Sequence, residues 1–298
     1  MATPHKKLIT NKGAWRLIES GFQDPYTNMA SDEALLDFFS EGKIPPTLRF
    51  YGWKPGGFSL GCFQDAELLL NTEKCNRGAV PFVRRMTGGS IVYHGSDISY
   101  SIVCRREDLA VPRGLNESYK GLCGFLVSGF RNLGLDPQYS LSQPKRSIKS
   151  GGFCCQEEET YDITLNGRKL GGNAQRRRRD VVFQHGFLPL HNDFEKGFTF
   201  SKSGTSKIDT KVISLNEALG REVQYIEIKE VLVKAFKEAF KVELKEDFFT
   251  LEENMAIERL VSIKYSQDKW NIQGIDDARN HKKAFKSRSF SSEPAAMA

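Results

Sequence analysis

The sequence contains no run of roughly eighteen or more apolar residues, so it predicts no helix that spans a membrane. Its first residues, MATPHKKLITNKGAWRLI, carry charges but no apolar stretch of the kind found in a secretory signal. No internal repeat is evident, and the composition is that of an ordinary globular protein. We therefore expect a cytoplasmic protein that does not act at a membrane.

The six cysteines form no pattern typical of a metal site or a disulfide framework. No two are spaced as C-x-x-C, and no cysteine and histidine spacing of a zinc site occurs, so we expect no metal. Neighbouring Cys154 and Cys155 rarely bond to each other because the vicinal geometry is strained, and we expect reduced thiols. The other four are expected to be small buried hydrophobic residues: Cys62, Cys75, Cys104 and Cys123.

Excess positive charge is concentrated towards the C-terminal end. The 298 residues carry a net charge of +6, from 43 Lys and Arg against 37 Asp and Glu. Residues 279–298 hold five of these cations and one anion, which leaves 38 cations and 36 anions elsewhere, or +2. Because this body is nearly neutral, its charge does not by itself indicate nucleic-acid binding. Residues 277–298 lack periodicity, so we expect a basic, disordered tail after one folded domain over 1–276.

The pattern of short strands and amphipathic helices predicts the α+β class, with a mixed or antiparallel sheet and flanking helices. Strands are predicted at 47–53, 58–63, 79–83, 90–94, 97–104 and 181–190. Along 97–104 the apolar residues fall on one face, which predicts a half-buried strand: Ile98, Tyr100, Ile102 and Cys104. Asn166-Gly167 is typical of a tight turn and predicts a hairpin over 161–175.

Apolar residues at helical spacing predict helices over 115–133, 228–240 and 251–266. A further helix is predicted around NMASDEALL, with Asn28 or Ser31 as its cap. Asp32 and Glu33 would then lie in its first turn, where the helix dipole favours negative charge.

The stretch VRRMTGGSIVYH contains a first candidate site. Arg84 and Arg85 alternate faces in a strand, so one would face a ligand and the other a carboxylate or solvent. Gly88 and Gly89 allow backbone amides to approach an anion or polar ligand closely. A plain hairpin with a solvated arginine explains the stretch equally well, and the spacing is not that of a P-loop.

The stretch SGGFCCQ contains a candidate nucleophile. A thiol in a polar, glycine-rich loop can attack a carbonyl, and a nearby ammonium such as that of Lys169 favours the reactive thiolate. The alternative of a buried, inert cysteine is weaker for Cys154 and Cys155 because their loop is polar.

The stretch GRKLGGNAQRRRRD contains further polar candidates. Lys169 follows the tight turn and could anchor a carbonyl or phosphate or tune a thiol, although most hairpin lysines are solvated. Residues 176–179 predict a basic turn, either a solvated loop or a docking site for an acidic partner. His94 and His185 lie in or beside predicted strands, where a structural role is the commoner explanation for each.

Together, RRMTGGSIVYH, the Cys154 loop and GRKLGGNAQ…FQHGFLPL resemble the biotin/lipoate A/B protein ligase family. NMASDEALL and PPTLRFYGW-x-PGGFSLGCFQ extend the resemblance, which covers the chain from about Trp15 to Trp270. Within the family, the sequence is most similar to the octanoyltransferases that use a catalytic cysteine. The resemblance implies a catalytic domain like that of class II tRNA synthetases, with a large mixed sheet and flanking helices, over 1–276.

The resemblance also implies an activity in lipoate biosynthesis. An octanoyl group would pass from octanoyl-acyl carrier protein, through a thioester on Cys154, to a lysine of a lipoyl-accepting protein such as glycine-cleavage H protein. Lys169 would be the second catalytic residue. The expected substrate-binding residues are Arg84, Arg85, Gly88, Gly89, His94, Gly171, Gly172 and His185. Thioester exchange is nearly isoenergetic, so no ATP or other cofactor is implied, and no nucleic-acid partner is expected.

Two alternatives remain open. An ATP-dependent lipoate-protein ligase of the same family would need Lys169 but no cysteine, and such ligases commonly carry an added C-terminal domain. A non-catalytic protein that binds a carrier protein or nucleic acid through its basic residues would form no acyl-enzyme, and its binding to polyanions would depend strongly on salt.

Overall fold

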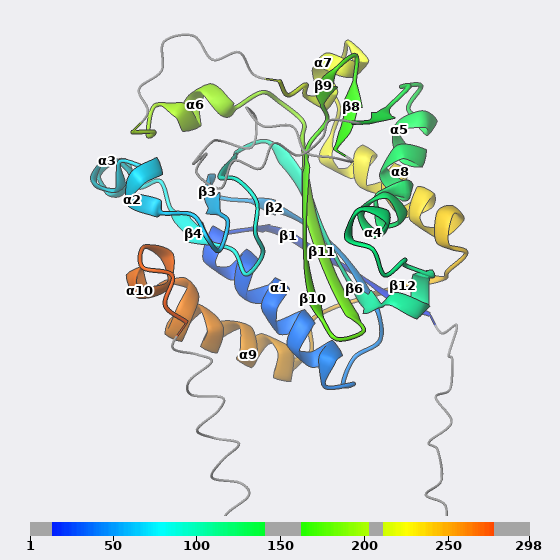
Figure 1. Cartoon of the computed structure of the whole chain (residues 1–298), viewed down its shortest axis with the longest axis horizontal. Coiled ribbons are helices and arrows are strands. Elements are labelled where there is room, and N and C mark those ends of the chain that lie inside the picture. The colour runs from blue at the N-terminus through cyan, green and yellow to red at the C-terminus, as the bar shows by residue number, and fades with distance from the viewer. Residues whose placement is uncertain (1–13, 141–161, 203–210, 277–298) are drawn as a thin grey trace, which may run out of the picture.

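The computed structural model describes residues 14–140, 162–202 and 211–276. A six-stranded sheet lies at its centre, in the order β10-β11-β6-β2-β1-β12 (Figure 1). Its strands are β1 (Trp15–Gln23), β2 (Thr47–Trp53), β6 (Asp97–Arg105), β10 (Gly172–Arg178), β11 (Val181–Pro189) and β12 (Leu244–Asp247). Strand β1 runs parallel to β2 and β12, and the other neighbours are antiparallel. The prediction of an α+β fold with a mixed sheet is therefore confirmed.

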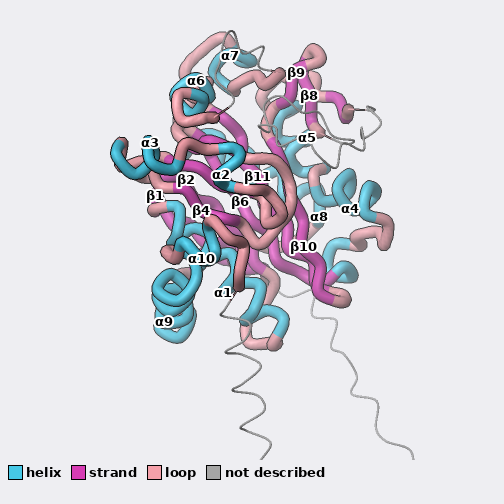
Figure 2. Tube along the Cα trace, turned by 60° about the vertical axis from the view of Figure 1, so that its left-hand side comes forward, coloured by secondary structure: helices cyan, strands magenta, loops and turns pink. Residues whose placement is uncertain are grey.

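Helices cover both faces of this sheet (Figures 1 and 2). Helices α1 (Pro25–Ser40) and α9 (Leu251–Leu260) lie on one face, and α5 (Gly124–Asn132) and α8 (Tyr225–Phe240) lie on the other. Along β6, Tyr100 and Ile102 pack in the cluster with α5 and α8, whereas Val103 packs with α1. Strand β6 is thus buried on both faces, and the prediction of a half-buried strand is wrong because α1 covers the second face.

Two small sheets and several short helices complete the described part of the chain. One sheet has the order β4-β3-β5, and the other has the order β7-β8-β9. Their strands are β3 (Gly57–Leu60), β4 (Phe82–Arg84), β5 (Val92–His94), β7 (Gln138–Tyr139), β8 (Ile163–Leu165) and β9 (Arg168–Lys169). The remaining helices are α2 (Ala66–Leu69), α3 (Thr72–Arg77), η1 (Arg106–Leu109), α4 (Leu115–Leu122), α6 (Phe194–Phe198), α7 (Leu215–Leu219), the π-helical η3 (Val261–Tyr265) and α10 (Asp268–Asn271).

Helix α1 begins earlier than predicted. Asp24 is its cap, and its side chain accepts hydrogen bonds from the amides of Tyr26 and Thr27. Pro25 follows at the first helical position, where its fixed φ is already helical and its missing N–H costs no hydrogen bond. Asn28 and Ser31, the predicted caps, are buried inside the helix instead. Asp32 therefore lies beyond the first turn, on a buried face.

The predicted hairpin over 161–175 divides between two sheets. Asn166 and Gly167, with φ of 51° and 75°, join β8 to β9 as the sequence predicts. The chain then leaves this sheet at Gly171, whose φ is 139°. A Cβ atom there would lie 2.2 Å from the carbonyl oxygen of Phe187, so only glycine permits this close passage.

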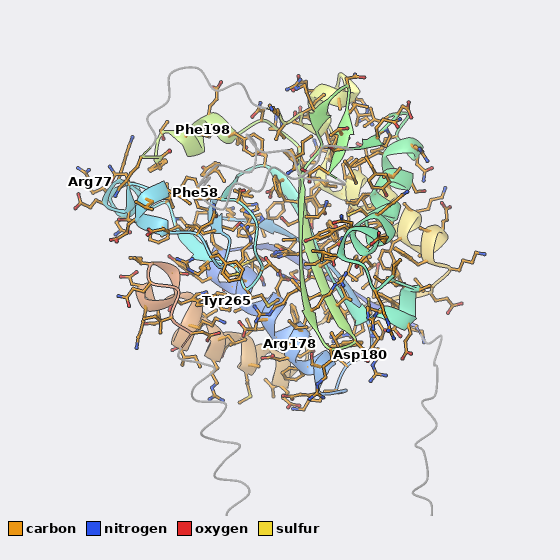
Figure 3. All side chains as sticks on the ribbon, viewed as in Figure 1. Phe58, Arg77, Arg178, Asp180, Phe198 and Tyr265 are labelled. Carbon is orange, nitrogen blue, oxygen red and sulfur yellow. The ribbon has the colours of Figure 1, made fainter. Side chains whose placement is uncertain are left out.

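Other boundaries also differ from the sequence predictions. Residues 176–178 belong to β10 rather than to a basic turn, and the turn itself follows at Arg179 and Asp180. Figure 3 shows Arg178 and Asp180 at the tip of the β10–β11 hairpin. The predicted helix over 115–133 is two helices, α4 and α5, which meet at Cys123.

The cysteine predictions hold for three of the four described thiols. Cys75, Cys104 and Cys123 are buried, whereas Cys62 is partly exposed. Cys154, Cys155 and the predicted tail at 277–298 lie outside the described residues. None of the helices within the described ranges has the length and apolar content to cross a bilayer.

Candidate active site

A cavity that is partly open to solvent lies between the central sheet and the sheet formed by β3, β4 and β5. Its apolar wall consists of Met29, Tyr51, Trp53, Val92 and Phe187. Its polar lining includes one arginine, one lysine and two histidines: Arg85, Lys169, His94 and His185. The cavity therefore combines an apolar wall with cationic and imidazole groups.

The structure brings most of the described candidate residues to this cavity. The residues that line it are Arg85, Gly89, His94, Lys169, Gly172 and His185. Arg84, Gly88 and Gly171 are not part of the lining. The predicted nucleophile Cys154 lies outside the described residues, so its relation to the cavity stays a prediction.

Lys169 forms a buried ion pair that the sequence analysis did not anticipate. Its Nζ lies 2.7 Å from Oδ2 of Asp162, and both side chains are largely buried. The hairpin register explains the pairing. Thr164 lies opposite Lys169. Asp162 is two residues before Thr164, so its side chain lies on the same face of the sheet as those of Thr164 and Lys169. The sequence feature that could have indicated this partner is the aspartate of YDITL, Asp162, in the predicted hairpin.

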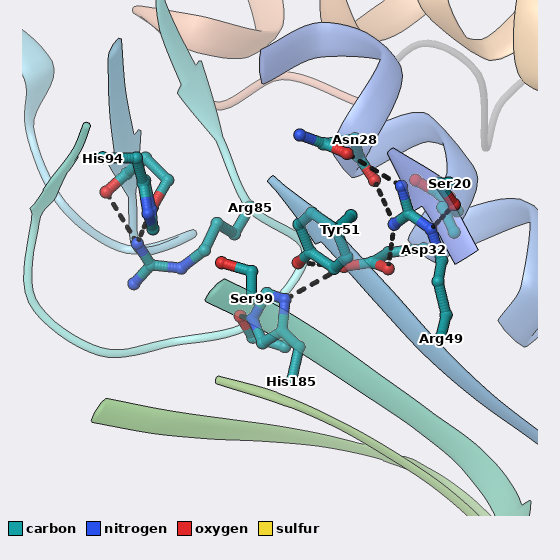
Figure 4. Close-up of polar contacts among 12 residues, drawn as sticks. Ser20, Asn28, Asp32, Arg49, Tyr51, Arg85, His94, Ser99 and His185 are labelled. Carbon is teal, nitrogen blue, oxygen red and sulfur yellow. Dashed lines mark hydrogen bonds and ion pairs between the residues drawn. The ribbon is translucent and has the colours of Figure 1, made fainter. Parts of the chain in front are cut away.

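His185 contacts Asp32 of helix α1, as Figure 4 shows, and also contacts the loop between β4 and β5. Its Nδ1 lies 3.1 Å from Oδ2 of Asp32, and its Nε2 lies 2.7 Å from the hydroxyl of Thr87. A carboxylate only accepts hydrogen bonds, so Nδ1 carries the proton and Nε2 accepts from Thr87. The sequence analysis assigned Asp32 only to a helix terminus, since the residues that face it come from β2 and β11.

Electrostatics keep Asp32 charged and His185 neutral. Burial raises the pKa of the Asp32 carboxyl, but His185 and Arg49 outweigh burial and hold that pKa below its ordinary value. Arg49 donates to Oδ1 of Asp32 at 2.8 Å. Burial lowers the pKa of His185 despite the opposing effect of Asp32. A neutral His185 can therefore accept the hydrogen bond from Thr87 across the physiological pH range.

His94 forms a second hydrogen-bonded chain on the cavity wall. Its Nδ1 lies 2.5 Å from Oδ2 of Asp97, and its Nε2 lies 2.8 Å from the hydroxyl of Ser59. Arg85 donates to the same hydroxyl at 2.8 Å, so the Ser59 hydroxyl joins Arg85 to His94. The His94 ring also stacks on Trp53, with centroids 3.8 Å apart and planes at 11°. Both histidines thus link the wall of the cavity to residues of the 84–90 loop.

The 84–90 loop is held from several elements at once. The Arg85 guanidinium donates to the carbonyls of Gly88 and Ser90, both at 3.1 Å, which folds the loop back on itself. Arg176 from β10 donates to the carbonyl of Met86. Gly89 has a φ of 96°, which favours glycine. The loop therefore presents a defined backbone surface to the cavity.

Arg84 faces away from the cavity, and the two arginines alternate as expected for a strand. Only Arg85 faces the candidate ligand site. The expectation that the other arginine faces a carboxylate or solvent is wrong, because Arg84 is 2% exposed and its side chain donates to backbone carbonyls. Burial lowers the pKa of Arg84.

Comparison with known proteins finds one matching family and several similar enzymes. Residues 24–237 match the family described as the lipoyl protein ligase A/B catalytic domain. The chain is 36% identical over 275 residues to the octanoyltransferase LipM of Geobacillus kaustophilus (strain HTA426), covering 88% of this chain and 99% of the relative. It is 33% identical to the octanoyltransferase LipM of Bacillus subtilis (strain 168), with the same coverage of 88% and 99%.

Two solved structures share the fold. A crystal structure of lipoate-protein ligase A bound with ATP has a TM-score of 0.72 and 25% identity, over 88% of this chain and 99% of that chain. The Thermoplasma acidophilum protein Ta0514, solved with bound lipoic acid, has a TM-score of 0.71 and 24% identity, over 88% of this chain and 99% of that chain. These similarities confirm the predicted fold.

Proposed function

Since the chain belongs to the lipoyl protein ligase A/B catalytic-domain family, we propose that it is an acyltransferase that moves octanoyl groups in lipoate biosynthesis. The observation that carries this function is identity of 32–36% to octanoyltransferases over 87–88% of the chain. The cavity adds support, because its apolar wall suits a saturated chain and its cationic groups suit a polarised carbonyl.

Cys154 is the proposed nucleophile. Its thiolate attacks the thioester carbonyl of octanoyl-acyl carrier protein, a new C–S bond forms, and the phosphopantetheine thiol leaves. Lys169, fixed by Asp162 at 2.7 Å, stabilises the thiolate and then the tetrahedral oxyanion. One well-placed donor of this kind contributes on the order of 3 kcal/mol to the transition state.

The second half-reaction forms the product. A deprotonated lysine amine of a lipoyl-accepting protein, such as glycine-cleavage H protein, attacks the octanoyl-enzyme. The C–N bond forms, the C–S bond breaks, and the departing Cys154 thiolate takes up the proton that the amine loses. Because an amide is more stable than a thioester, this step drives transfer without ATP.

Recognition of the octanoyl chain is assigned to the apolar wall of the cavity. Burying each methylene contributes about 0.8 kcal/mol, so an octanoyl chain gains several kcal/mol from contact with Tyr51, Trp53 and Val92. Arg85, Gly89, His94, Gly172 and His185 are proposed to position the reacting end. Arg84, Gly88 and Gly171 do not line the cavity and act indirectly, by shaping the backbone next to the lining residues Arg85, Gly89 and Gly172.

The arginines of the β10–β11 hairpin are the candidates for docking the carrier protein. Within 176–179, three arginines already have partners in the chain: Arg176 contacts Met86, Arg177 donates to the carbonyl of Arg113, and Arg178 pairs with Asp37. Arg179, at the hairpin turn, remains the candidate for steering an acidic partner.

A cytoplasmic location also stays a prediction.

Intact-protein mass spectrometry after incubation with octanoyl-acyl carrier protein tests the function. We expect a gain of one octanoyl group that is lost in Cys154→Ala and retained in Cys155→Ala. Addition of a lipoyl domain should then discharge the group. No mass gain in the wild-type protein would contradict the mechanism.

The similarity to an ATP-bound lipoate-protein ligase makes an ATP-dependent ligase the second candidate. Free octanoate with ATP should modify a lipoyl domain in that case, and Cys154→Ser should retain full activity. We expect neither result.

A further inference from the structure

We propose that residues 264–276, which we call the C-terminal clamp, position the 84–90 loop of the active site by holding Arg84. The clamp comprises the end of η3, helix α10 and the turn that follows, and it lies outside the matched family region of 24–237. This inference deepens the proposed function, because it assigns a positioning role to residues that do not touch the acyl group.

The Arg84 side chain is bound by backbone carbonyls from two distant segments. Three carbonyls belong to the clamp: Trp270 at 2.8 Å, Asn271 at 3.0 Å and Ile272 at 2.9 Å. Three belong to the turn after β3: Gly61 at 3.3 Å, Cys62 at 3.3 Å and Gln64 at 2.5 Å. The five donors of a planar guanidinium serve these six carbonyls because Nη1 shares its two hydrogens among Gly61, Cys62 and Gln64, whereas a lysine ammonium has only three donors. Arg84 therefore joins three segments at one buried point.

The clamp also holds the backbone of Arg84. The indole N–H of Trp270 donates to the Arg84 carbonyl at 2.8 Å, and the Arg84 amide donates to Oδ1 of Asn271 at 2.9 Å. Asn271 in turn donates from Nδ2 to the carbonyl of Tyr265 at 2.7 Å. Both peptide groups that flank Arg84 are thus fixed immediately before Arg85, the arginine that lines the cavity.

The clamp is anchored to helix α1 through a buried ion pair. Lys264 is 2% exposed, and its Nζ lies 2.7 Å from Oε2 of Glu33 and 2.9 Å from Oδ2 of Asp276. The Tyr265 hydroxyl donates to the same Glu33 oxygen at 2.5 Å. Glu33 is next to Asp32, which holds His185 and through it Thr87. Adjacent residues of α1 therefore support the loop at two points: at its first residue, through the clamp and Arg84, and at its middle, through His185 and Thr87.

The turn bound by Arg84 touches the loop a second time. The amide of Cys62 donates to the carbonyl of Thr87 at 2.8 Å, and the amide of Arg85 donates to the carbonyl of Leu60 at 2.8 Å. A displacement of Arg84 would therefore move the loop at both contacts. Because transfer rates depend on sub-ångström placement of the groups around the reacting carbonyl, loosening the clamp should slow acylation rather than merely weaken folding.

A pair of matched tryptophan variants tests the positioning role. Trp270→Phe keeps an aromatic ring but removes the donor to Arg84, while Trp15→Phe makes the same change in the core beside Phe236. We expect Trp270→Phe to lower the single-turnover acylation rate at saturating donor by about tenfold. Trp15→Phe should leave that rate unchanged, at a temperature where circular dichroism shows both variants folded. Equal rates in Trp270→Phe and the wild type would overturn the proposal.

Asn271 provides a second test if Trp270→Phe fails to fold. Asn271→Asp keeps the acceptor for the Arg84 amide and loses the amide donor to the Tyr265 carbonyl, whereas Asn271→Leu has a similar shape but loses both. We expect Asn271→Leu to lower the acylation rate by about tenfold and Asn271→Asp to lower it clearly less. Equal rates in these two variants would show that the hydrogen bond has no positioning role.

Hydrogen exchange separates this inference from the proposed function. Amides of residues 84–90 should exchange faster in Trp270→Phe and Asn271→Leu than in the wild type and Trp15→Phe, whether or not the chain transfers octanoyl groups. Unchanged exchange would refute the clamp. Faster exchange together with an absence of acylation in the wild type would support the clamp and refute the transferase mechanism.

Discussion

At the scale of single residues, two buried carboxylates determine how the polar groups of the cavity are held. Asp162 pairs with Lys169, and Asp32 pairs with both Arg49 and His185. Removing one partner of a buried pair leaves an uncompensated charge, which is more harmful than the loss of an exposed pair. Both carboxylates should therefore matter for activity although neither is proposed to react.

Asp162→Asn should lower octanoyl transfer by about a hundredfold, because it removes the charge that orients the Lys169 ammonium. Single-turnover mass spectrometry of the acyl-enzyme measures this effect. Glu217→Gln is the matched control. Glu217, on α7, pairs with Arg168, which is next to Lys169 in β9, but the Glu217 side chain is exposed. Comparable losses in the two variants would argue against a specific role for Asp162.

Acid should destabilise the wild-type protein more than a His185→Gln variant. The folded pKa of His185 lies below its ordinary value of about 6.5, so the unfolded chain binds more protons as the pH falls through that value. Stability is therefore full above the unfolded pKa and declines below it. Thermal midpoints measured from about pH 7.5 down to about pH 5 should fall less steeply in the variant.

The exposed His191 supplies the control for this pH dependence. His191→Gln should retain the wild-type slope. An identical slope in His185→Gln would show that His185 does not contribute to the acid sensitivity.

At the scale of elements, the chain crosses between β9 and β10 at one position that tolerates only glycine. Gly171 connects Lys169 of one sheet to Gly172 of another, and both of these residues line the cavity. The crossing brings the lysine next to the β10–β11 hairpin, which supplies His185. The positions of Lys169 and His185 relative to each other thus depend on the backbone at Gly171.

Gly171→Ala should destabilise the fold by about 2 kcal/mol or more, because the added Cβ would lie 2.2 Å from a backbone oxygen. Denaturant unfolding monitored by circular dichroism measures this change. Gly167→Asn is the control, because Gly167 has a φ of 75°, which asparagine tolerates, and no described atom lies within 4 Å of the added Cβ. Unaltered stability in Gly171→Ala would contradict the requirement for glycine at this crossing.

At the scale of the whole molecule, the C-terminal elements are tied to the first strand. Arg16 on β1 forms ion pairs with Asp247 at the end of β12 and with Glu253 on α9, both at 2.8 Å. Figure 1 shows β12 beside β1 and α9 beneath the sheet. Figure 3 places Tyr265, a residue of the clamp, beside α1. The first strand and the C-terminal elements of the described chain therefore stabilise each other.

Glu253→Gln should destabilise the protein by about 3 kcal/mol, because it leaves the buried Arg16 without its main counter-charge. Its neighbour Glu252 provides the control, since it pairs with Lys43 at the surface, and Glu252→Gln should leave the unfolding midpoint nearly unchanged. Urea titrations of both variants measure the difference. An equal, small effect in both would show that the buried pair is not important for stability.

The sequence alone determined the local features and the family. Turn residues such as Asn166-Gly167 and the alternation of side chains in β2 and β6 predicted these elements, because each pattern depends on neighbours within a few positions, although the inferred half-burial of β6 was wrong. The order of the elements predicted the α+β class with a mixed or antiparallel sheet. The resemblance of the motifs around Arg85, Lys169 and His185 to a known family implied the acyltransferase class. The role of Cys154 as the nucleophile stays a prediction.

Only the tertiary structure decided which side chains meet. It showed that Arg84 binds backbone carbonyls of residues 270–272, that Asp32 faces His185, and that α1 buries the second face of β6. These partners lie far apart in the chain, and no local periodicity encodes them. Their contacts result from the packing of helices on both faces of one sheet, which brings distant polar groups together where they must satisfy one another.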